Sequence, residues 1–272
     1  MTVVAVIVLA LAVVGGFWGQ HLLRRKRTAD DDIDPRHEGL PVSELIVPVR
    51  LLATLLLAFV LVAVFQSFQD AGDEAAEEAG AVLAMAEDTT MLTPDARTDI
   101  LGTLRCYALS VTGPDWHAQA ELGMPSPATD AAADDVAAAL QRATADPRNS
   151  VAMGSILSSN ADRIATRIER VAEGRPTVPG EVWVLMVVTL AAVVAGLAAY
   201  AHPHVRRSTQ VAVVAGSAVV FALTLWLLHD LDRPYDGLVR TEPTAMLDVT
   251  HRMTTLAGGA PAPCNADGTP LR

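Results

Sequence analysis

The sequence predicts an all-α membrane protein: four transmembrane helices, with a large helical soluble domain between the second and third spans. Four apolar segments lie at 2–23, 45–66, 182–201 and 209–228, each close to the ~20 residues that a helix needs to cross a bilayer. Hydrocarbon offers no water to backbone amides, so such segments must be helical. Hydrophobic residues make up 51% of the chain but aromatic residues only 4%. This composition favours lipid-facing Ala, Val and Leu over a soluble core built on large rings.

The apolar segments divide the chain into spans and connections of different character. In order, we expect transmembrane helix 1 (1–23), a basic cytoplasmic link (24–44), transmembrane helix 2 (45–66), a helical extracytoplasmic domain (67–181), transmembrane helix 3 (182–201), a cytoplasmic turn (202–208), transmembrane helix 4 (209–228), an elbow with a short helix (229–256) and a flexible tail (257–272). The protein is therefore expected to be a multi-pass protein of the cell membrane, with the lipid bilayer as its first partner.

Charge is distributed unevenly along the chain. The formal net charge is −11, and the excess of acidic side chains lies in residues 67–181, which contain no lysine. Binding to nucleic acid requires a basic surface that neutralises phosphates. The acidic balance therefore excludes nucleic acid as an expected partner.

Basic residues near the spans predict the orientation. Arg24, Arg25, Lys26 and Arg27 follow the first span, and Arg206 and Arg207 lie in the short turn between the last two. Cytoplasmic loops carry the excess of Lys and Arg, whereas a cleaved signal peptide carries its basic residues before the apolar run. We therefore expect an uncleaved first helix, both basic connections in the cytoplasm, and residues 67–181 and 229–272 outside.

The two cysteines test this orientation. Cys106 lies in the soluble domain and Cys264 in the Pro/Gly-rich tail, and both are outside in the predicted topology, where oxidising conditions permit disulfides. A bridge would fasten the tail, which is otherwise expected to be disordered. The alternative is two unrelated thiols, with Cys106 buried as a small apolar residue.

Within the soluble domain the patterns predict a series of helices. The second span is expected to continue as a helix through 67–91, with Ala75, Ala79 and Val82 on its apolar side and Glu74, Glu77 and Glu78 on solvated faces. Thr93-Pro94 is typical of a helix start, and Gly113-Pro114 is expected to interrupt that helix before Trp116. Residues 123–129 are expected to form a loop, from which Asp130 caps a short helix. The last helix is expected to begin at Asn149 or Ser150 and to end at Gly174. Its apolar stripe is expected to comprise Ile156, Leu157, Ile164, Ile168 and Val171.

No motif announces catalysis. The sequence contains no glycine-rich phosphate loop, no paired-cysteine metal spacing, no His-Glu-x-x-His and no Gly-x-Ser-x-Gly elbow. His202-Pro203-His204 stands where the third span ends, beside Arg206-Arg207, and is interpreted as helix capping rather than as a metal site. We expect no cofactor, no metal and no enzymatic activity.

Several stretches, in this order and spacing, resemble the bestrophin-like domain family of bacterial membrane proteins. They are Leu55–Leu83 with its Glu78-Ala79 pair, Tyr107 and Trp116, Pro179–Trp183, and the stretch Leu231–Arg240 that contains Asp232, Pro234, Tyr235 and Gly237. The resemblance covers most of residues 45–250. It implies kinship with bestrophins, pentameric anion channels of four spanning helices with a large helical region.

The resemblance has two departures. In animal bestrophins an Asp-Pro-Phe-Gly stretch after the last span helps to build a calcium clasp. Here Tyr235 replaces Phe and no acidic run follows, so the calcium site is not carried over. Bestrophins also keep the helical region in the cytoplasm, whereas the arginine pattern here places it outside.

Two functions remain open. By the resemblance, the chain is a homo-oligomeric ion channel or transport component, most simply with its pore lined by the second span around Leu56, Phe59 and Phe65. A hydrophobic neck is compatible with a gated channel. The alternative is a non-conducting interaction or sensing module, whose helical domain binds another envelope protein.

Overall fold

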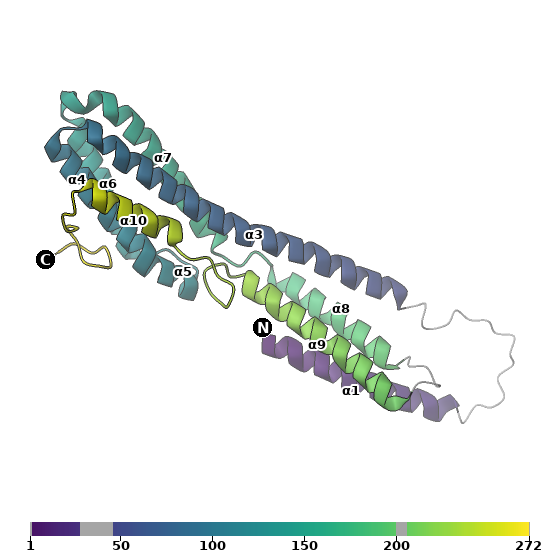
Figure 1. The fold of residues 1–272 in the computed structure, drawn as a ribbon. Helices are drawn as coiled ribbons and strands as arrows, with labels where there is room; N and C mark the ends of the chain where they lie inside the picture. Colours follow the sequence, from purple (N-terminus) through teal and green to yellow (C-terminus); the bar gives the residue numbers. More distant parts are fainter. Residues whose placement is uncertain (1, 28–45, 200–205, 272) are drawn as a thin grey trace. The chain divides into compact units, whose positions relative to one another are not determined.

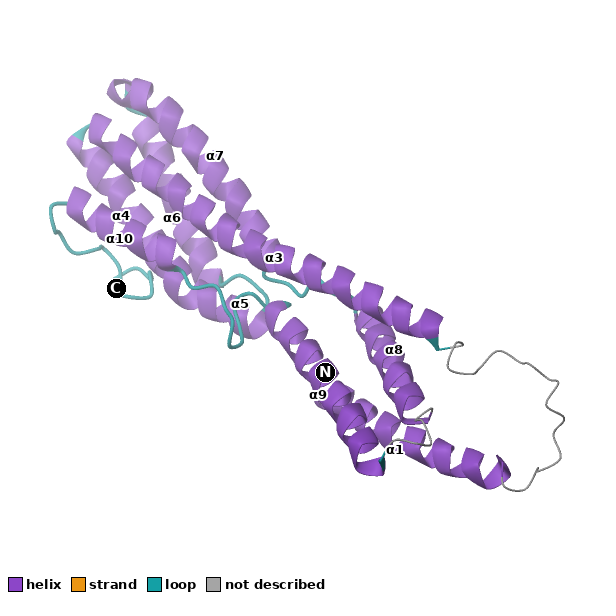
Figure 2. Cartoon of the chain, turned by 45° about the vertical axis from the view of Figure 1, so that its right-hand side comes forward, coloured by secondary structure: helices purple, strands orange, loops and turns teal. Residues whose placement is uncertain are grey.

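The computed structural model describes residues 2–27, 46–199 and 206–271. Within these ranges the chain forms helices and connecting loops without a strand (Figure 2), which confirms the all-α class. The helices are α1 (Thr2–Arg27), α3 (Val47–Asp88), α4 (Pro94–Ser110), α5 (Trp116–Leu122), α6 (Pro127–Thr144), α7 (Ser150–Glu173), α8 (Gly180–Ala199), α9 (Arg207–Leu231) and α10 (Thr244–Leu256). The predicted turn with His202 and His204, and most of the basic link 24–44, lie outside the described residues.

The chain divides into two compact units. The first unit comprises Met1–Phe65 and Thr177–Asp230, and the second comprises Gln66–Pro176 and Leu231–Arg272. The first contains α1, α8, α9 up to Asp230 and the beginning of α3. The second contains the remaining helices (Figure 1). The segment after the last span therefore belongs to the same compact unit as the predicted soluble domain.

Apolar helices of membrane-spanning length make up most of the first unit. Three described helices are long and apolar enough to cross a bilayer: Val47–Met91, Gly180–Ala199 and Ser208–Leu231. In α1 the described side chains give a shorter apolar stretch, Ala5–Gly19. The count of four spans thus remains a prediction, with three of its helices present at the required length.

Small residues let two of these helices approach closely. A Cβ placed on Gly16 of α1 would lie 2.6 Å from the Cβ of Ala198 and 2.7 Å from the carbonyl oxygen of Ala195, both on α8. On Gly196 of α8 it would lie 2.6 Å from Cδ1 of Ile46. Close backbone approach through small residues is the usual basis of helix packing in lipid, where no hydrophobic effect drives helices together.

The second unit is a bundle around an apolar core. The end of α3 lies with α4, α6, α7 and α10 (Figure 1), and these helices share one cluster of buried side chains. The largest side chains of this cluster that are fully buried are Met85, Ile100, Leu104, Tyr107, Ile156 and Met253. The buried residues of α4 include Ile100, Leu101, Leu104, Tyr107 and Ala108.

The regular α-helix is interrupted around Gly113-Pro114 as predicted, since α4 ends at Ser110 and α5 begins at Trp116, but the interruption is not a loop. A π-helical turn over Val111–Asp115 carries the chain from α4 into α5 without a break. Proline has no amide hydrogen and its ring collides with the carbonyl four residues earlier, and the wider π turn accommodates it. The helix start predicted at Asp130 is wrong, because α6 begins at Pro127 and Ser126 caps it, its side chain accepting from the Ala128 amide at 3.3 Å.

The stripe predicted for α7 is wrong at most of its positions. Ile156 is fully buried, but Ile164 is 46% exposed and Ile168 is 65% exposed. The buried residues on the C-terminal half of the helix are Arg163, Thr166 and Arg170. Polar partners inside the bundle therefore outweigh the apolar pattern in setting how α7 is rotated.

The tail after α10 is held in place. Cys264 forms a disulfide with Cys106 of α4, with their Cα atoms 5.8 Å apart. Gly268 has a φ of 79° and lies against the carbonyl oxygen of Cys106. A Cβ placed on Gly268 would lie 2.6 Å from the amide nitrogen of Ser110. This close approach in the left-handed region admits only glycine. The sequence predicts a flexible tail unless Cys264 is bonded, and the disulfide shows that Cys264 is bonded and holds the tail.

Candidate functional site

The segment after α9 that resembles the bestrophin motif folds back into the second unit. Pro234 accepts a hydrogen bond from the Thr241 amide at 2.7 Å, and Gly237 has a φ of 98°, so the chain turns tightly there. Tyr235 is 3% exposed. Its hydroxyl lies 3.2 Å from the Ala71 carbonyl oxygen and 3.3 Å from that of Arg170. The motif therefore joins α3 and α7 through one tyrosine.

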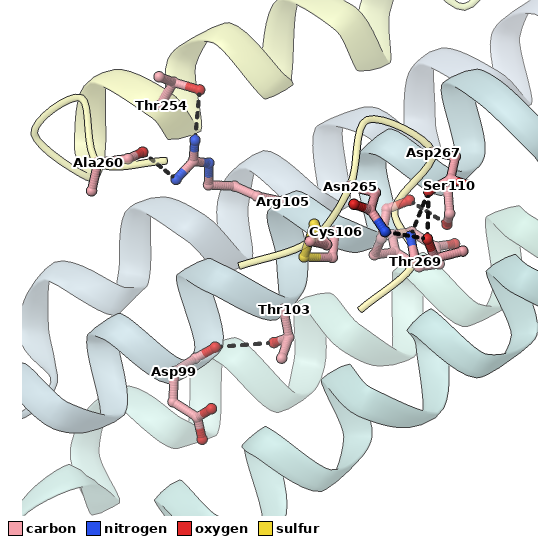
Figure 3. Close-up of a disulfide and its surroundings, with 12 residues drawn as sticks. Asp99, Thr103, Arg105, Cys106, Ser110, Thr254, Ala260, Asn265, Asp267 and Thr269 are labelled. Atoms are coloured by element: carbon pink, nitrogen blue, oxygen red, sulfur yellow. Dashed lines mark hydrogen bonds between the residues drawn. A yellow bond between two sulfur atoms is a disulfide. The ribbon is translucent and has the colours of Figure 1, made fainter. Parts of the chain in front are cut away.

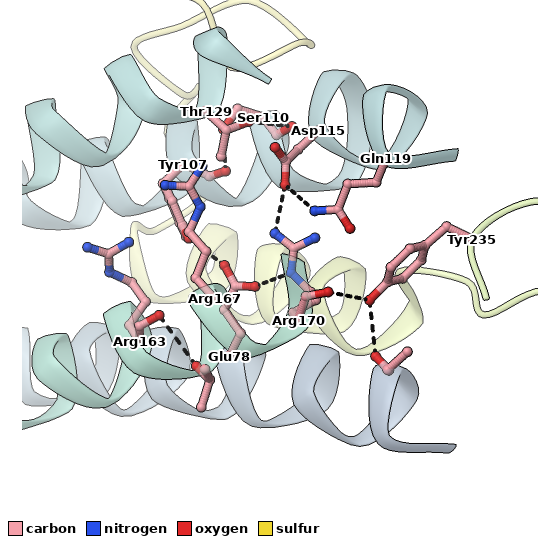
Figure 4. A network of polar contacts seen from close by, with 12 residues as sticks. Glu78, Tyr107, Ser110, Asp115, Gln119, Thr129, Arg163, Arg167, Arg170 and Tyr235 are labelled. Carbon is pink, nitrogen blue, oxygen red and sulfur yellow. Dashed lines mark hydrogen bonds and ion pairs between the residues drawn. The ribbon is translucent and has the colours of Figure 1, made fainter. Parts of the chain in front are cut away.

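Next to Tyr235 a guanidinium lies buried between two carboxylates (Figure 4). Arg170 of α7 donates from Nε to Glu78 of α3, and from Nη2 to Asp115 Oδ2 at 2.7 Å. All three side chains are 0% exposed. Burying a charge is costly unless it is paired and hydrogen-bonded. This arrangement meets that condition for both acids at once.

The π-helical turn places Asp115 in this network. Its Oδ1 accepts from the Ser126 amide at 2.7 Å, and its Oδ2 accepts from Gln119 Nε2 at 3.3 Å as well as from Arg170. Asp115 therefore holds the start of α6, the first turn of α5 and α7 together. π-Helical turns occur frequently at functional sites, and here the turn supplies a buried acid.

Aromatic rings enclose the ion pairs. The Tyr107 hydroxyl donates to Glu78, and the Arg163 guanidinium lies 4.6 Å from the centre of the Tyr107 ring. Trp116 meets Tyr235 edge to face with ring centres 4.7 Å apart, and its indole nitrogen donates to the Thr241 carbonyl at 3.3 Å. Such edge-to-face pairs add stability beyond their buried area.

Burial and charge perturb the titration of these groups in ways that keep the network intact. Burial, together with the neighbouring Glu78, raises the pKa of Tyr107, so its hydroxyl stays protonated and able to donate. Burial alone would lower the pKa of Arg170, but Glu78 and Asp115 outweigh it and the pKa is raised. Burial also raises the pKa of Tyr235. At physiological pH both tyrosines remain neutral donors.

The network is a structural junction and offers little surface for chemistry. Glu78, Tyr107, Asp115 and Arg170 have no exposed surface, so a substrate has no path to them in this conformation. In the part of the chain that the structure describes, no group of three or more His, Cys, Asp or Glu side chains could hold a metal ion. The junction ties together α3, α7, the π turn and the motif segment.

The residues predicted to line a pore lie on α3 within the first unit. Phe59 is 73% exposed and Phe65 is 48% exposed, whereas Leu56 is half-buried. Because α3 is one continuous helix, the nine positions from Leu56 to Phe65 cover two and a half turns. The side chains of Leu56 and Phe65 therefore lie on opposite sides of α3. The three residues cannot line one pore face together.

Comparison with protein families accounts for the motif. A family model described as the bestrophin-like domain matches residues 6–246. The chain belongs to the bestrophin-like family. A solved structure of a bacterial bestrophin homologue from Klebsiella pneumoniae that carries a mutation matches with a TM-score of 0.72 and 11% identity, covering 93% of this chain and 99% of that one. At this identity the match shows the fold. A search of curated proteins gave no significant match.

The sequence signals for the bestrophin-like family thus fall on the buried junction. Of the residues that carry the resemblance, Glu78, Tyr107, Trp116 and Tyr235 all contribute to it. Asp232 and Pro234 are buried beside it, and Gly237 makes the turn that returns the chain. The expectation that Glu78 lies on a solvated acidic face is wrong, because Tyr107 and Arg170 both donate to it.

Two members of the junction were not singled out from the sequence. They are Arg170 and Asp115, which belong to no recognised motif in the sequence. One signal was available for Glu78: it follows Ala71 and Ala75 at the spacing that repeats on one side of a helix, a side that is buried here. A carboxylate on the buried side of a helix requires a buried cation as its partner.

Proposed function

We propose that this bestrophin-like chain is one subunit of a homo-oligomeric ion channel in the cell membrane. It crosses the bilayer four times, through α1, α3, α8 and α9. The chain acts by conduction and carries out no enzymatic reaction. Membership of the bestrophin-like family supports this proposal, as does the fold shared with a bestrophin homologue.

One observation carries the proposal: the apolar part of α3 is left largely uncovered by its own chain. Only 17% of its most apolar window is buried, the same share as in α9, compared with 44% for α8. Ala53, Val60 and Val64 form its buried side, and Phe59 points away from that side. A helix that is covered on one narrow side is suited to neighbouring subunits and a pore, in addition to lipid.

The exposed side of α3 changes character along its length. Leu52, Leu55, Phe59 and Val62 are exposed and apolar, whereas the exposed positions further along include the amides and acids Gln66, Gln69, Asp70, Asp73 and Glu77. Rings of Asp or Glu select for cations. If this side of α3 faces the pore, the acidic residues favour cations over the anions that the bestrophin kinship first suggests.

The orientation that we propose places the second unit outside the cell. The arginine cluster after the first span supports it through the positive-inside rule. The disulfide between Cys106 and Cys264 supports it too, because disulfides persist in oxidising compartments and are rare in the cytosol. Labelling of single cysteines placed near Ala120, in intact cells and with an impermeant reagent, tests this orientation.

Ion flux through liposomes containing the purified protein tests the channel directly. We expect flux of a monovalent cation or anion in protein-containing vesicles and none in empty vesicles, with Phe59→Ala changing the rate several-fold. Leu223→Ala is the matched control, because Leu223 is 59% exposed on α9, outside the proposed pore helix. Measuring K+ and Cl− flux separately decides the selectivity.

A non-conducting interaction module is the second candidate, favoured by the exposed apolar side chains of α7. Leu157, Ile164 and Ile168 are 43%, 46% and 65% exposed and repeat at helical spacing, as expected of a helix that packs on another protein. The channel accounts for them as contacts between copies. A protein that is monomeric in mild detergent and silent in both flux assays favours the module.

A further inference from the structure

A cavity of about 900 Å3 lies between α4 and the C-terminal tail in the second unit. One wall is a face of α4, and the other is the chain from the end of α10 to Pro270. Apolar side chains supply most of this lining: Leu92, Leu101, Leu256, Ala257, Pro261, Pro263 and Pro270. Both the size and this lining are typical of sites for small organic molecules.

Two arginines bring positive charge to this mostly apolar cavity. Arg97 donates from Nη2 to the Leu256 carbonyl at 2.9 Å. Arg105 donates from Nη1 to the Ala260 carbonyl at 2.8 Å, and its Nη2 lies 3.4 Å from Thr254 Oγ1. Figure 3 shows the Arg105 guanidinium between Thr254 and Ala260, next to the disulfide of Cys106. Side chains four residues apart share a face of a helix. Arg97 and Arg105 are eight residues apart, so they lie about two turns from each other on the side of α4 that lines the cavity.

Arg105 is buried without a counter-charge. The residue is 6% exposed, and its Nε has no hydrogen-bond partner. Neither Arg97 nor Arg105 forms an ion pair with a carboxylate among the described residues, and the partners of Arg105 are a carbonyl and a hydroxyl. Two acids line the cavity, but Asp99 is already paired with Arg142 at 2.8 Å, and Asp135 is exposed. In the second unit, Arg170 shows the opposite case, with two carboxylates around one guanidinium.

We propose that this cavity binds an organic anion with an apolar body, whose carboxylate or phosphate group pairs with Arg105 and Arg97. A buried, uncompensated charge is costly, and an anion held beside the guanidinium of Arg105 offsets that cost. Arginine suits this role, because its planar guanidinium remains charged and matches carboxylate and phosphate geometry. The apolar body of the ligand lies along the leucines and prolines of the walls.

The disulfide closes this site. Cys264 and Pro263 both line the cavity, and Pro263 Cγ lies 3.2 Å from the position that a Cβ on Gly102 would take. The bond to Cys106 thus holds the tail wall against α4. Reduction of the disulfide frees this wall and weakens binding.

Titration calorimetry on the full chain in a non-ionic detergent, with the disulfide intact and detergent blanks subtracted, tests the proposal. The probes are hexanoate, hexyl phosphate, 1-hexanol and inorganic phosphate. We expect both amphiphilic anions to bind at least tenfold more tightly than 1-hexanol, which lacks the charge, and than inorganic phosphate, which lacks the apolar body. Arg105→Gln is expected to weaken the binding of the anions at least tenfold. Arg148→Gln, which removes an exposed arginine outside the cavity, is expected to leave it unchanged.

A second variant keeps the test decisive if Arg105→Gln loosens the tail. Thr98 is exposed and lines the cavity, so Thr98→Trp occupies part of the space while both arginines stay in the chain, and it is expected to weaken binding at least tenfold. Equal affinity for hexanoate and 1-hexanol overturns the proposal, and so does binding that survives both Arg105→Gln and Thr98→Trp. After either result, the role left to Arg97 and Arg105 would be to hold the tail through their hydrogen bonds to its carbonyl groups. If inorganic phosphate binds as tightly as hexyl phosphate, the ligand needs no apolar body and the proposed class is wrong.

Discussion

The two units of this chain are stabilised by opposite means. In the first unit, the contact between α1 and α8 depends on the absence of side chains, at Gly16 and at the alanines that face it. In the second unit, the helices are joined by the longest polar side chains available, with Arg170 reaching both Glu78 and Asp115. Lipid gives apolar helices no reason to associate except close packing and polar contacts. A water-exposed bundle can instead use its apolar core for stability.

The difference shows what each unit requires of its sequence. The contact between α1 and α8 in the first unit constrains only the size of a few side chains, such as Gly16 and Ala198. A buried ion triad constrains more, since each charge requires its partner at the right position. Buried ionic groups are weak evidence of stability, but at this junction they define one register of α3 against α7. We regard the junction as the element that specifies the second unit.

Breaking the junction is expected to have the largest effect of the changes considered. Arg170→Ala leaves Glu78 and Asp115 buried without their cation, and removing one partner of a buried pair costs ~3–5 kcal/mol. The midpoint of chemical unfolding, followed by circular dichroism in detergent, measures this loss. Arg148→Ala serves as the control, because Arg148 pairs with Asp146 on the surface, and it is expected to leave the midpoint unchanged. If both variants unfold at the same denaturant concentration, the junction contributes nothing.

Removing the disulfide is expected to have the next largest effect. Cys106→Ser with Cys264→Ser opens a loop that joins residues 158 apart in sequence. Loss of a native disulfide costs ~2–5 kcal/mol, mainly through the unfolded chain. Thermal unfolding of wild type in the presence and absence of reductant gives the measurement, and the double variant should match the reduced wild type. Proteolysis within residues 257–271 should increase in parallel. A tail as protected in the variant as in the wild type would show that the other tail contacts suffice.

The sequence predicted the helical class and the spans as apolar segments, and it offered the closing of the tail by cysteines as one of two alternatives, but it did not predict the junction. Length and apolar composition determine helices in a membrane, so α3, α8 and α9 follow from local patterns. The rotation of α7 does not, because Ile164 and Ile168 compete with Arg163 and Arg170 for the core. Residues 92 apart, as Glu78 and Arg170 are, leave no local trace of their pairing. The motif of Tyr235 could be recognised by resemblance, but its contacts could not.

A smaller effect is expected in the first unit, at the contact between α1 and α8. Gly16→Ala places a methyl group 2.6 Å from Ala198 Cβ and 2.7 Å from the Ala195 carbonyl oxygen, and overpacking of this kind costs ~1–3 kcal/mol. Gly15→Ala is the matched control, since a Cβ there meets nothing within 4 Å. Alanine also favours the helix more than glycine does, so the control is expected to be neutral or stabilising. Thermal unfolding in detergent compares the two. A Gly16→Ala protein as stable as Gly15→Ala would mean that α1 does not pack on α8 in this way.

The smallest effect is expected from pH, through Glu74 on α3 in the second unit. Partial burial and the nearby carboxylate of Glu169, which shares a hydrogen bond with it, raise the pKa of Glu74 from 4.5 to about 7. The folded state therefore holds a proton that the unfolded chain has released between these two values. Where the folded state binds more protons, the free energy of unfolding falls as the pH rises. This contribution is present in full below pH 4.5 and is lost by about pH 7.

Unfolding midpoints at pH 5 and pH 8 measure this contribution. Glu74→Gln removes the proton exchange but keeps the shape, so its midpoint should change less between the two pH values than that of the wild type. Glu121→Gln is the control, because Glu121 is exposed on α5, and it should follow the wild type. The same slope in all three proteins would place the pH dependence elsewhere. A smaller pH dependence in Glu74→Gln alone would show that protonation of Glu74 stabilises the contact between α3 and α7. This contribution would add to that of the buried ion pairs of Arg170.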